Sequence, residues 1–405
     1  MSKPWWGIVA LVALVSVLLR HHLLFLMSLL MALVGLTSHL WAYYCLAGVS
    51  YQRHFGSTRL FFGEETDLHV EITNAKPLPL AWLRAEDEYP ADLEIVPAHA
   101  HYSYLPRRRL LVNLLSLRWY EKVTRHYRLR GTRRGAWQFG PVEIASGDIF
   151  GFATRREKLP DRQFILVYPK IVPLTALGLP ARYPFGDFKT PRRLIEDPIR
   201  LMGAREYVPG DNFRYIHWKA TARRQTLQTK VFEPSAARPL AIFLNINTFD
   251  RVYEGIDPDL QEFAITTAAS IARWAWEEGY PIGLYVNSVA QPGGERIRIR
   301  PGSHPDQLSW ILEALAKVVG YGRWPIEAVT LVESRGLRYG TTIVVVTPII
   351  NERLCEVLID LQRYEFGVAL VALGEARLEK PLPGVRYYHV GGREVWHELG
   401  SLELA

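Results

Sequence analysis

The sequence predicts a membrane-anchored protein of several domains: an N-terminal transmembrane helical hairpin, an all-β sandwich-like domain and a C-terminal α/β domain. Three observations predict this order. The N-terminal residues are almost all apolar, the next stretch alternates apolar and polar residues, and the C-terminal half has continuous apolar runs separated by helical patterns. A chain of 405 residues with 49% hydrophobic content is long enough for two or three folded units.

The hairpin is expected in residues 1–50, with spans at about 4–19 and 23–49. The first span has 16 residues, which reach about 24 Å as a helix and fall short of a hydrocarbon core of roughly 30 Å. Aromatic residues at both ends fit interfacial belts: Trp5, Trp6, Trp41, Tyr43 and Tyr44. A signal peptide is the alternative, but the longer apolar run that follows directly argues against it.

Few charges flank the hairpin. Lys3 precedes it, Arg53 and Arg59 follow it, and Arg20 lies in the connecting turn. Because basic residues favour the cytoplasmic side, both ends are expected inside. The sequence therefore predicts a multi-pass protein of the cell membrane whose soluble part is cytoplasmic.

Residues 52–170 are expected to form the all-β sandwich or a small barrel. Leu68, Val70 and Ile72 alternate with polar residues, as in half-buried strands, and turn residues separate such segments. Ten Lys or Arg residues lie between His101 and Arg134, against a single acid, Glu121. This charge predicts a contact with anionic lipid, at roughly 1 kcal/mol per basic residue, with a solvated strand surface as the alternative. The expected lipid contacts are Arg107, Arg108, Arg109, Arg125 and Arg128. Nucleic acid is not expected, because no nucleic-acid fold motif is present.

Residues 171–235 are expected to be a connector rich in Pro and Arg, and residues 236–405 an α/β domain. Buried strands are predicted at 240–246, 282–286 and 342–346, with 368–373 as the last. Helices are predicted to begin at Asp257-Pro258, Ser303 and Asn351. Alternating strands and helices indicate a mostly parallel central sheet.

Three segments together resemble a known family. They are RRGAWQFGPVEIASGDIFGF (133–152), VYPK (167–170) and REYVPGDNFRYIHWKATARR (205–224). With the N-terminal hairpin, they resemble the bacterial and archaeal family called domain of unknown function 58. The resemblance implies a von Willebrand factor type A-like C-terminal half. It also implies a role beside MoxR-type AAA+ ATPases and transglutaminase-like membrane proteins, with which such proteins are commonly encoded.

The third segment concentrates polar and aromatic side chains. Its candidate site residues are Arg205, Glu206, Tyr207, Gly210, Asp211, Arg214, His217, Trp218, Lys219 and Arg223. In one interpretation His217 is a general base oriented by Asp211, which would make the protein a hydrolase. In the other, Asp211 caps the following segment, Arg205 pairs with a nearby charge and Trp218 packs between folded units. The second is favoured, because no phosphate loop, nucleophile elbow or second His or Cys cluster completes a catalytic set.

The type A resemblance implies a Mg²⁺ adhesion site after the first strand of the α/β domain. The matching positions here are Asn245, Asn247 and Phe249, with Asp250 nearby. Replacing carboxylates by amides removes the charge that offsets dehydration of the cation. No catalytic residue, metal or cofactor is therefore expected. The two cysteines, Cys45 and Cys355, give no support to a disulfide framework or a cysteine zinc site.

The sequence thus predicts a non-enzymatic, membrane-anchored adaptor for protein–protein interaction. Its expected partner is a MoxR-type AAA+ ATPase or another membrane-system protein, in assembly or maturation of a membrane or envelope complex. Two alternatives remain open: a Mg²⁺-dependent adhesion or chelatase-like module, and a hydrolase centred on His217.

Overall fold

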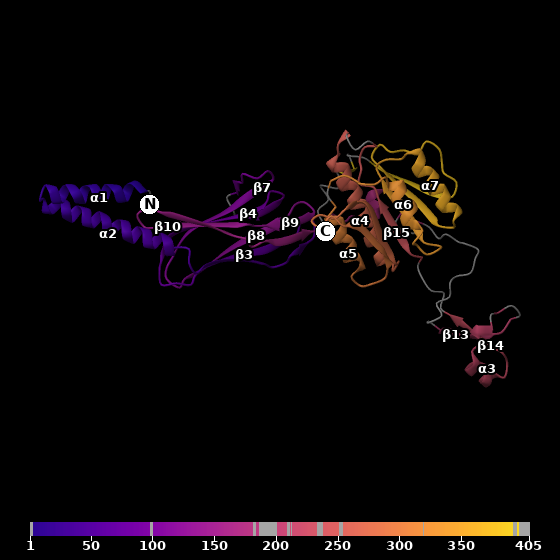
Figure 1. Cartoon of the computed structure of the whole chain (residues 1–405). Coiled ribbons are helices and arrows are strands. Elements are labelled where there is room, and N and C mark those ends of the chain that lie inside the picture. The colour runs from indigo at the N-terminus through magenta and orange to yellow at the C-terminus, as the bar shows by residue number, and fades with distance from the viewer. Residues whose placement is uncertain are drawn as a thin grey trace. The chain divides into compact units, whose positions relative to one another are not determined.

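The computed structural model describes residues 3–97, 100–180, 184–185, 201–208, 211, 213–232, 238–250, 254–318, 320–391 and 395–396. The chain divides into two compact units, Met1–Pro169 and Lys170–Ala405 (Figure 1). Unit 1 contains a helical hairpin and a set of β-sheets, here called the β-unit. Unit 2 contains a small two-stranded module and a larger α/β core. Each is described by itself.

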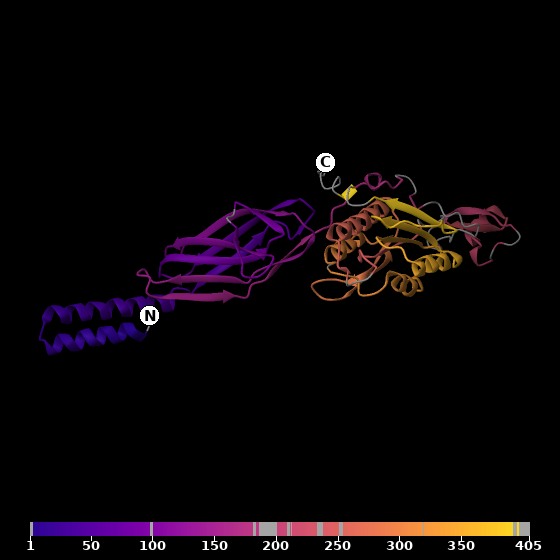
Figure 2. The same cartoon turned by 90° about the horizontal axis from the view of Figure 1, so that it is seen from above.

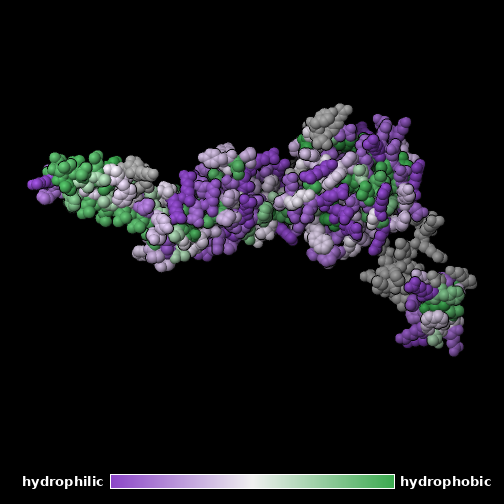
Figure 3. Space-filling model, viewed as in Figure 1, coloured by the Kyte–Doolittle hydropathy of each residue, from purple (hydrophilic) through white to green (hydrophobic). Residues whose placement is uncertain are grey.

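The hairpin consists of α1 (Lys3–Leu18) and α2 (His22–Tyr44), which run side by side in Figures 1 and 2. Helix α2 is long and apolar enough to cross a membrane, whereas α1 is apolar but shorter. Their outer surfaces are apolar (Figure 3), and small polar residues such as Ser16, Ser28 and Ser38 are buried instead. Of the two predicted spans, α2 is confirmed as an apolar helix of sufficient length, and no other helix among the described residues passes the same test of length and composition.

The β-unit is built from twelve strands. They are β1 (Val49–Phe55), β2 (Arg59–Leu60), β3 (Glu65–Asn74), β4 (Leu80–Pro90), β5 (Leu93–Val96), β6 (Ala100–Tyr102), β7 (Arg108–Leu117), β8 (Lys122–Gly131), β9 (Gly135–Phe139), β10 (Val142–Gly147), β11 (Thr154–Leu159) and β12 (Gln163–Val167). They form sheets in the orders β1-β3-β8-β5, β11-β10-β4-β7-β6 and β2-β12-β9. The alternation predicted for Leu68, Val70 and Ile72 is confirmed, because all three side chains are fully buried in the core of this unit.

The α/β core is a six-stranded sheet in the order β17-β16-β15-β18-β19-β20. Its elements are β15 (Leu240–Leu244), α4 (Pro258–Glu277), β16 (Ile282–Val289), β17 (Arg296–Gly302), α5 (Gln307–Ala316), α6 (Ile326–Ser334), β18 (Thr342–Thr347), α7 (Glu352–Arg363), β19 (Gly367–Leu373) and β20 (Val385–Val390). All neighbouring strands are parallel except β16 and β17. A mostly parallel sheet is therefore confirmed. Every residue of β15, β18 and β19 is buried, which explains their continuous apolar runs.

Of the three helix starts predicted in this core, two are confirmed and one is wrong. The Asp257 carboxylate accepts from the backbone amides of residues 259 and 260 at the start of α4, and Asn351 caps α7 by accepting from the Leu354 amide. The predicted start at Ser303 is wrong, because α5 begins at Gln307 and Asp306 occupies its N-cap position. The prediction that residues 368–373, which lie in β19, form the last strand is also wrong. Strand β20 follows β19, and its polar, half-exposed sequence VRYYHV lacks the apolar signal of a buried strand.

The module in unit 2 is formed by β13 (Leu201–Glu206), the 3₁₀ turn η2 (Phe213–Tyr215), α3 (Trp218–Arg224) and β14 (Gln228–Phe232). The two strands pair antiparallel, with Arg205 opposite Thr229 and Glu206 opposite Gln228. The sequence had suggested only a connector here, because polar residues outnumber apolar ones and obscure the strand period. This pairing brings Arg205 and Glu206, at the beginning of the REYVPGD...ATARR segment, next to residues 228 and 229, which follow its end.

Candidate functional site

An ion pair closes the module. The Arg205 guanidinium donates to both carboxylate oxygens of Asp211, at 2.7 Å each. The backbone amide of Val208 and the hydroxyl of Thr229 also donate to Asp211, both at 3.1 Å. The Arg205 hydrogen bond, with help from the Val208 amide, lowers the pKa of Asp211 to about 2. Asp211 is thus an ionised carboxylate that joins β13, the turn after it and β14; Gly210 lies outside the described residues.

His217 serves as the N-cap of α3. Its Nδ1 accepts from the Ala220 amide at 3.1 Å, and its own backbone amide donates to the Gln228 carbonyl at 2.8 Å. A neutral imidazole whose Nδ1 accepts carries its proton on Nε2, so Nε2 cannot take a proton from a substrate. Among the described residues, the groups that donate to Asp211 are Arg205, Val208 and Thr229, and His217 is not one of them. The geometry therefore opposes a general base oriented by Asp211.

Aromatic and basic side chains cover the outside of the module. Phe213 and Trp218 are 68% and 69% exposed, and the rings of Tyr207 and Phe213 lie 5.6 Å apart. We call this surface the motif face; its members are Tyr207, Val208, Phe213, Arg214, Tyr215, Trp218, Lys219, Arg223 and Arg224. The acidic residues of the described module are Glu206 and Asp211, and Asp211 is neutralised by Arg205.

Trp218, which was expected to pack between folded units, is exposed on the module. The buried apolar position next to it is taken by Ile216, which is 3% exposed and bridges to Thr229. Trp218 is the first residue of α3, a helix of seven residues without a buried side chain, and it points away from the small core. Sequence alone could not decide which of Ile216 and Trp218 is buried, because both side chains are large and apolar and the residues lie two positions apart.

A second candidate site lies at the carboxyl ends of the central strands of the α/β core. Here β15 stands between β16 and β18, the point where strand order reverses and where ligands bind in open α/β sheets. The Asn245 side-chain amide donates to the Thr347 hydroxyl at 3.0 Å, and the Asn287 amide donates to the Asn245 oxygen at 2.7 Å. The Asn287 oxygen accepts from the Ile246 amide at 3.0 Å. This neutral network is buried.

Two further positions of the expected adhesion site, Asn247 and Asp250, differ in their surroundings. Asn247 accepts from the Gly322 amide at 2.7 Å, and a side chain at Gly322 would place its first carbon 2.3 Å from the Asn287 nitrogen. Asp250 is exposed on the loop after β15. Among the described residues, no three His, Cys, Asp or Glu side chains gather in a way that could bind a metal ion. Sequence analysis missed Asn287 and Gly322; the available signal for Asn287 was its position directly after the apolar run 282–286.

Calorimetry of the full-length chain in detergent should therefore show no heat of binding up to millimolar Mg²⁺, because the oxygens of Asn245 and Asn247 already accept protein hydrogen bonds. The melting temperature should likewise not change when EDTA replaces Mg²⁺. Saturable binding that Asn245→Ala abolishes would contradict this prediction.

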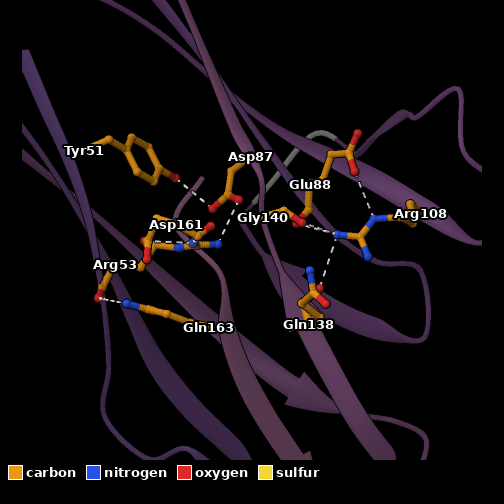
Figure 4. A network of polar contacts seen from close by, with 9 residues as sticks. All are labelled: Tyr51, Arg53, Asp87, Glu88, Arg108, Gln138, Gly140, Asp161 and Gln163. Carbon is orange, nitrogen blue, oxygen red and sulfur yellow. Dashed lines mark hydrogen bonds and ion pairs between the residues drawn. The ribbon is translucent and has the colours of Figure 1, made fainter. Parts of the chain in front are cut away.

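A third polar cluster lies inside the β-unit (Figure 4). Asp87 accepts from Tyr51 at 2.9 Å and from Arg53 at 3.1 Å, and Arg53 also donates to Asp161 at 2.9 Å. The side chains of Arg53 and Asp87 are 0% and 1% exposed. The cluster connects β1 with β4 and with the turn before β12, so it serves packing within this unit.

The basic residues proposed for lipid contact are not equivalent. Arg108 donates to Glu88 at 3.1 Å and to the Gly140 carbonyl at 2.7 Å, so its charge is engaged within the β-unit (Figure 4). Arg109 is half-buried, whereas Arg107, Arg125 and Arg128 are exposed.

Comparison with known proteins places the motif in a family. The family described as "Protein of unknown function DUF58" matches residues 203–316, from β13 to the end of α5. Over these residues the chain is similar to the DUF58 family. The matched part contains both the motif face and the neutral network around Asn245.

A curated relative is the "Uncharacterized protein YeaD" of Bacillus subtilis (strain 168), 27% identical over 256 residues. The match covers 60% of this chain and 57% of the relative, so the chain spans little more than half of that protein's length. Among solved structures, a CARDB domain of Pyrococcus furiosus gives a TM-score of 0.19 at 8% identity, covering 29% of this chain and 91% of that one. A cohesin of Archaeoglobus fulgidus gives 0.21 at 17%, covering 30% and 91%. Likenesses this low carry no argument about this chain.

Proposed function

We propose that this protein is a membrane-anchored adaptor that binds a partner protein through the motif face. The partner we propose is a MoxR-type AAA+ ATPase, in assembly or maturation of a membrane or envelope complex. One observation carries the proposal: the segment 205–224 exposes Phe213 and Trp218, whereas its ion pair and histidine cap are used for its own folding. Exposed aromatic residues beside arginines are typical of the energetic centre of protein interfaces.

The charge of the motif face indicates the chemistry of the partner surface. Lys219, Arg223 and Arg224 are exposed on α3, the helix that begins at Trp218, while Asp211 is paired. An acidic segment of the partner that includes apolar side chains would complement this face. Opposite charges increase the association rate, and the Trp218 ring would pack in a pocket formed by the apolar side chains. Binding should therefore weaken as salt concentration rises.

The anchor we propose is the hairpin, with α1 and α2 both crossing the membrane and both ends cytoplasmic. Three features support it: the apolar outer surface, the length of α2 and the packing of α1 beside it (Figure 3). Helix α1 has 16 residues, about 24 Å, so local thinning of the bilayer would be needed around it. We also propose that the α/β core is von Willebrand factor type A-like, with a neutral Asn245–Asn287 network where a metal would bind.

The proposal is tested with the full-length chain in nanodiscs and the purified MoxR-type ATPase encoded in the same genome. Trp218→Ala should weaken binding by roughly tenfold or more, measured by biolayer interferometry, since an exposed aromatic centre contributes about 2 kcal/mol. Trp276→Ala is the matched control, because Trp276 is also exposed, at 45%, but lies on α4 outside the motif face.

Equal binding by Trp218→Ala and wild type would show that the motif face is not the docking surface. Affinity capture after mild detergent extraction, followed by mass spectrometry, tests the partner independently. If repeated captures contain no ATPase above background, the MoxR assignment is wrong.

A further inference from the structure

Strand pairing determines which loops lie at each end of the β-unit. Strand β7 runs from Arg108, opposite Pro90, to Leu117, opposite Leu80. Strand β10 ends at Gly147, next to the same end of β4, because Ser146 pairs with Leu83. The loops 118–121 and 148–153 therefore lie at one end of the sheet. Arg107 lies at the other, ten residues of β7 or about 30 Å away.

The end with the two loops is fastened to the hairpin. The Ser38 hydroxyl of α2 donates to Asp148 at 2.7 Å, and both residues are 1% exposed. Arg155 donates to the Tyr43 carbonyl at 2.5 Å, and its guanidinium lies 5.6 Å from the centre of the Tyr43 ring. The rings of Trp5 and Phe152 lie 5.2 Å apart, so α1 takes part as well.

The chain leaves little freedom at this junction. Helix α2 ends at Tyr44 and β1 begins at Val49. Between them, the Cys45 carbonyl accepts from the Lys76 ammonium at 2.6 Å. Figures 1 and 2 show the helices joining the strands at this end. If the hairpin crosses a membrane, the loop end of the β-unit is at the surface of that membrane.

Both loops expose large apolar side chains. Trp119 and Tyr120 are 66% and 69% exposed in the first loop. In the second loop, Ile149, Phe150 and Phe152 are 56%, 49% and 46% exposed. Asp148 fixes the second loop by accepting from the amides of Phe150 and Ala153, at 3.3 and 2.8 Å. Burial of Asp148 opposes its ionisation, but these amides and Ser38 outweigh it and lower the pKa of the carboxyl group.

We propose that these two loops insert into the interfacial region of the bilayer. Trp and Tyr favour that depth, and the exposed Arg118 and Arg155 would contact phosphate headgroups beside them. The inference rests on the proposed membrane anchor and adds a second contact, made by the β-unit itself. It replaces the lipid contact expected at Arg107, Arg108 and Arg109, which lie at the opposite end of β7.

The test measures depth in the membrane with a fluorescent label on single cysteines. The full-length chain, with Cys355→Ser and the buried Cys45→Ala as background, is reconstituted in nanodiscs that contain brominated phosphatidylcholine and phosphatidylglycerol. Labels replace Phe150 and Tyr120 in the loops, Leu30 on the exposed surface of α2, and Tyr104, which is 104% exposed at the far end of the β-unit. The proposal expects quenching at both loop positions, with a depth near the hydrocarbon boundary, about 15 Å from the centre.

Quenching at Leu30 but not at Tyr104 is the pattern that validates the measurement. If Leu30 is quenched while Phe150 and Tyr120 stay as unquenched as Tyr104, the loop proposal is wrong and the anchor stands. If Leu30 is not quenched either, the anchor itself is wrong, and the loop proposal with it. A third result, loop labels shielded from aqueous iodide but not quenched by lipid, would mean that protein covers these loops and would also overturn the proposal.

Discussion

Arg53→Met is expected to destabilise the β-unit by about 3–5 kcal/mol near pH 8, the range for removing one partner of a buried ion pair. The substitution leaves Asp87, whose side chain is 1% exposed, with only the Tyr51 hydroxyl as a donor among the contacts described above. It also removes the bonds from Arg53 to Asp161. Methionine preserves most of the side-chain volume, so the loss reports charge rather than a cavity.

The pH dependence of this loss has a definite sign. Burial raises the pKa of Asp87 to about 6, although Arg53 and Tyr51 act in the opposite direction. Without Arg53 this pKa should rise further. A carboxyl whose pKa is raised in the folded state contributes stability below its unfolded value, and that contribution is lost as pH rises through the folded value. The destabilisation of Arg53→Met should therefore shrink from about pH 8 to about pH 5, where Asp87 is protonated.

Hydrogen exchange measured by mass spectrometry is the suitable measurement, because the two units need not unfold together. Peptides from β3 and β4 report the β-unit in the full-length chain. Arg84→Met is the matched control, since the ion pair of Arg84 with Glu86 on β4 is half exposed and worth at most about 1 kcal/mol. Equal protection in the two variants would show that the Arg53–Asp87 pair does not determine the stability of this unit.

Asn287→Ala is expected to destabilise the α/β core by about 3–5 kcal/mol. Asn287 is fully buried, donates to Asn245 at 2.7 Å and to the Trp324 carbonyl at 3.2 Å, and accepts from the Ile246 amide. Alanine leaves the Ile246 amide and the Trp324 carbonyl without these bonds, and each buried unsatisfied group costs about 1–3 kcal/mol. Thermal unfolding together with hydrogen exchange of β15 and β18 measures the loss.

Ser288→Ala provides the matched control at the next position of β16. Ser288 is also fully buried, but its hydroxyl makes one long hydrogen bond, 3.3 Å, to the Tyr321 carbonyl. Its loss should cost about 1 kcal/mol or less. Similar effects of the two substitutions would mean that the amide network at the ends of the central strands is not what stabilises them.

Local sequence patterns were sufficient for much of the fold. Apolar runs predicted α2, β15 and β18, and the side chains of Asp257 and Asn351 marked helix starts because a cap depends only on residues within one turn. The family resemblance depended on the hairpin and three segments, among them REYVPGDNFRYIHWKATARR, whose residue order is recognisable without a structure. The absence of carboxylates at Asn245 and Asn247 was likewise readable from residue type alone.

Tertiary structure decided where those residues point and what they contact. Asn287 joined the Asn245 network only because β15 and β16 are neighbours in the sheet, a contact between residues 42 positions apart. The ion pair of Arg205 with Asp211 and the cap made by His217 assigned these side chains to folding, and exposure assigned Trp218 to the surface.

The sequence by itself determined the kinds of element and the chemical groups available, because periodicity and residue type are local properties. Only the fold decided that Arg107 lies at the end of the β-unit opposite to the hairpin and that Phe152 lies beside the hairpin. Which ends of strands share an edge depends on strand pairing over long sequence separations, and no local pattern encodes it.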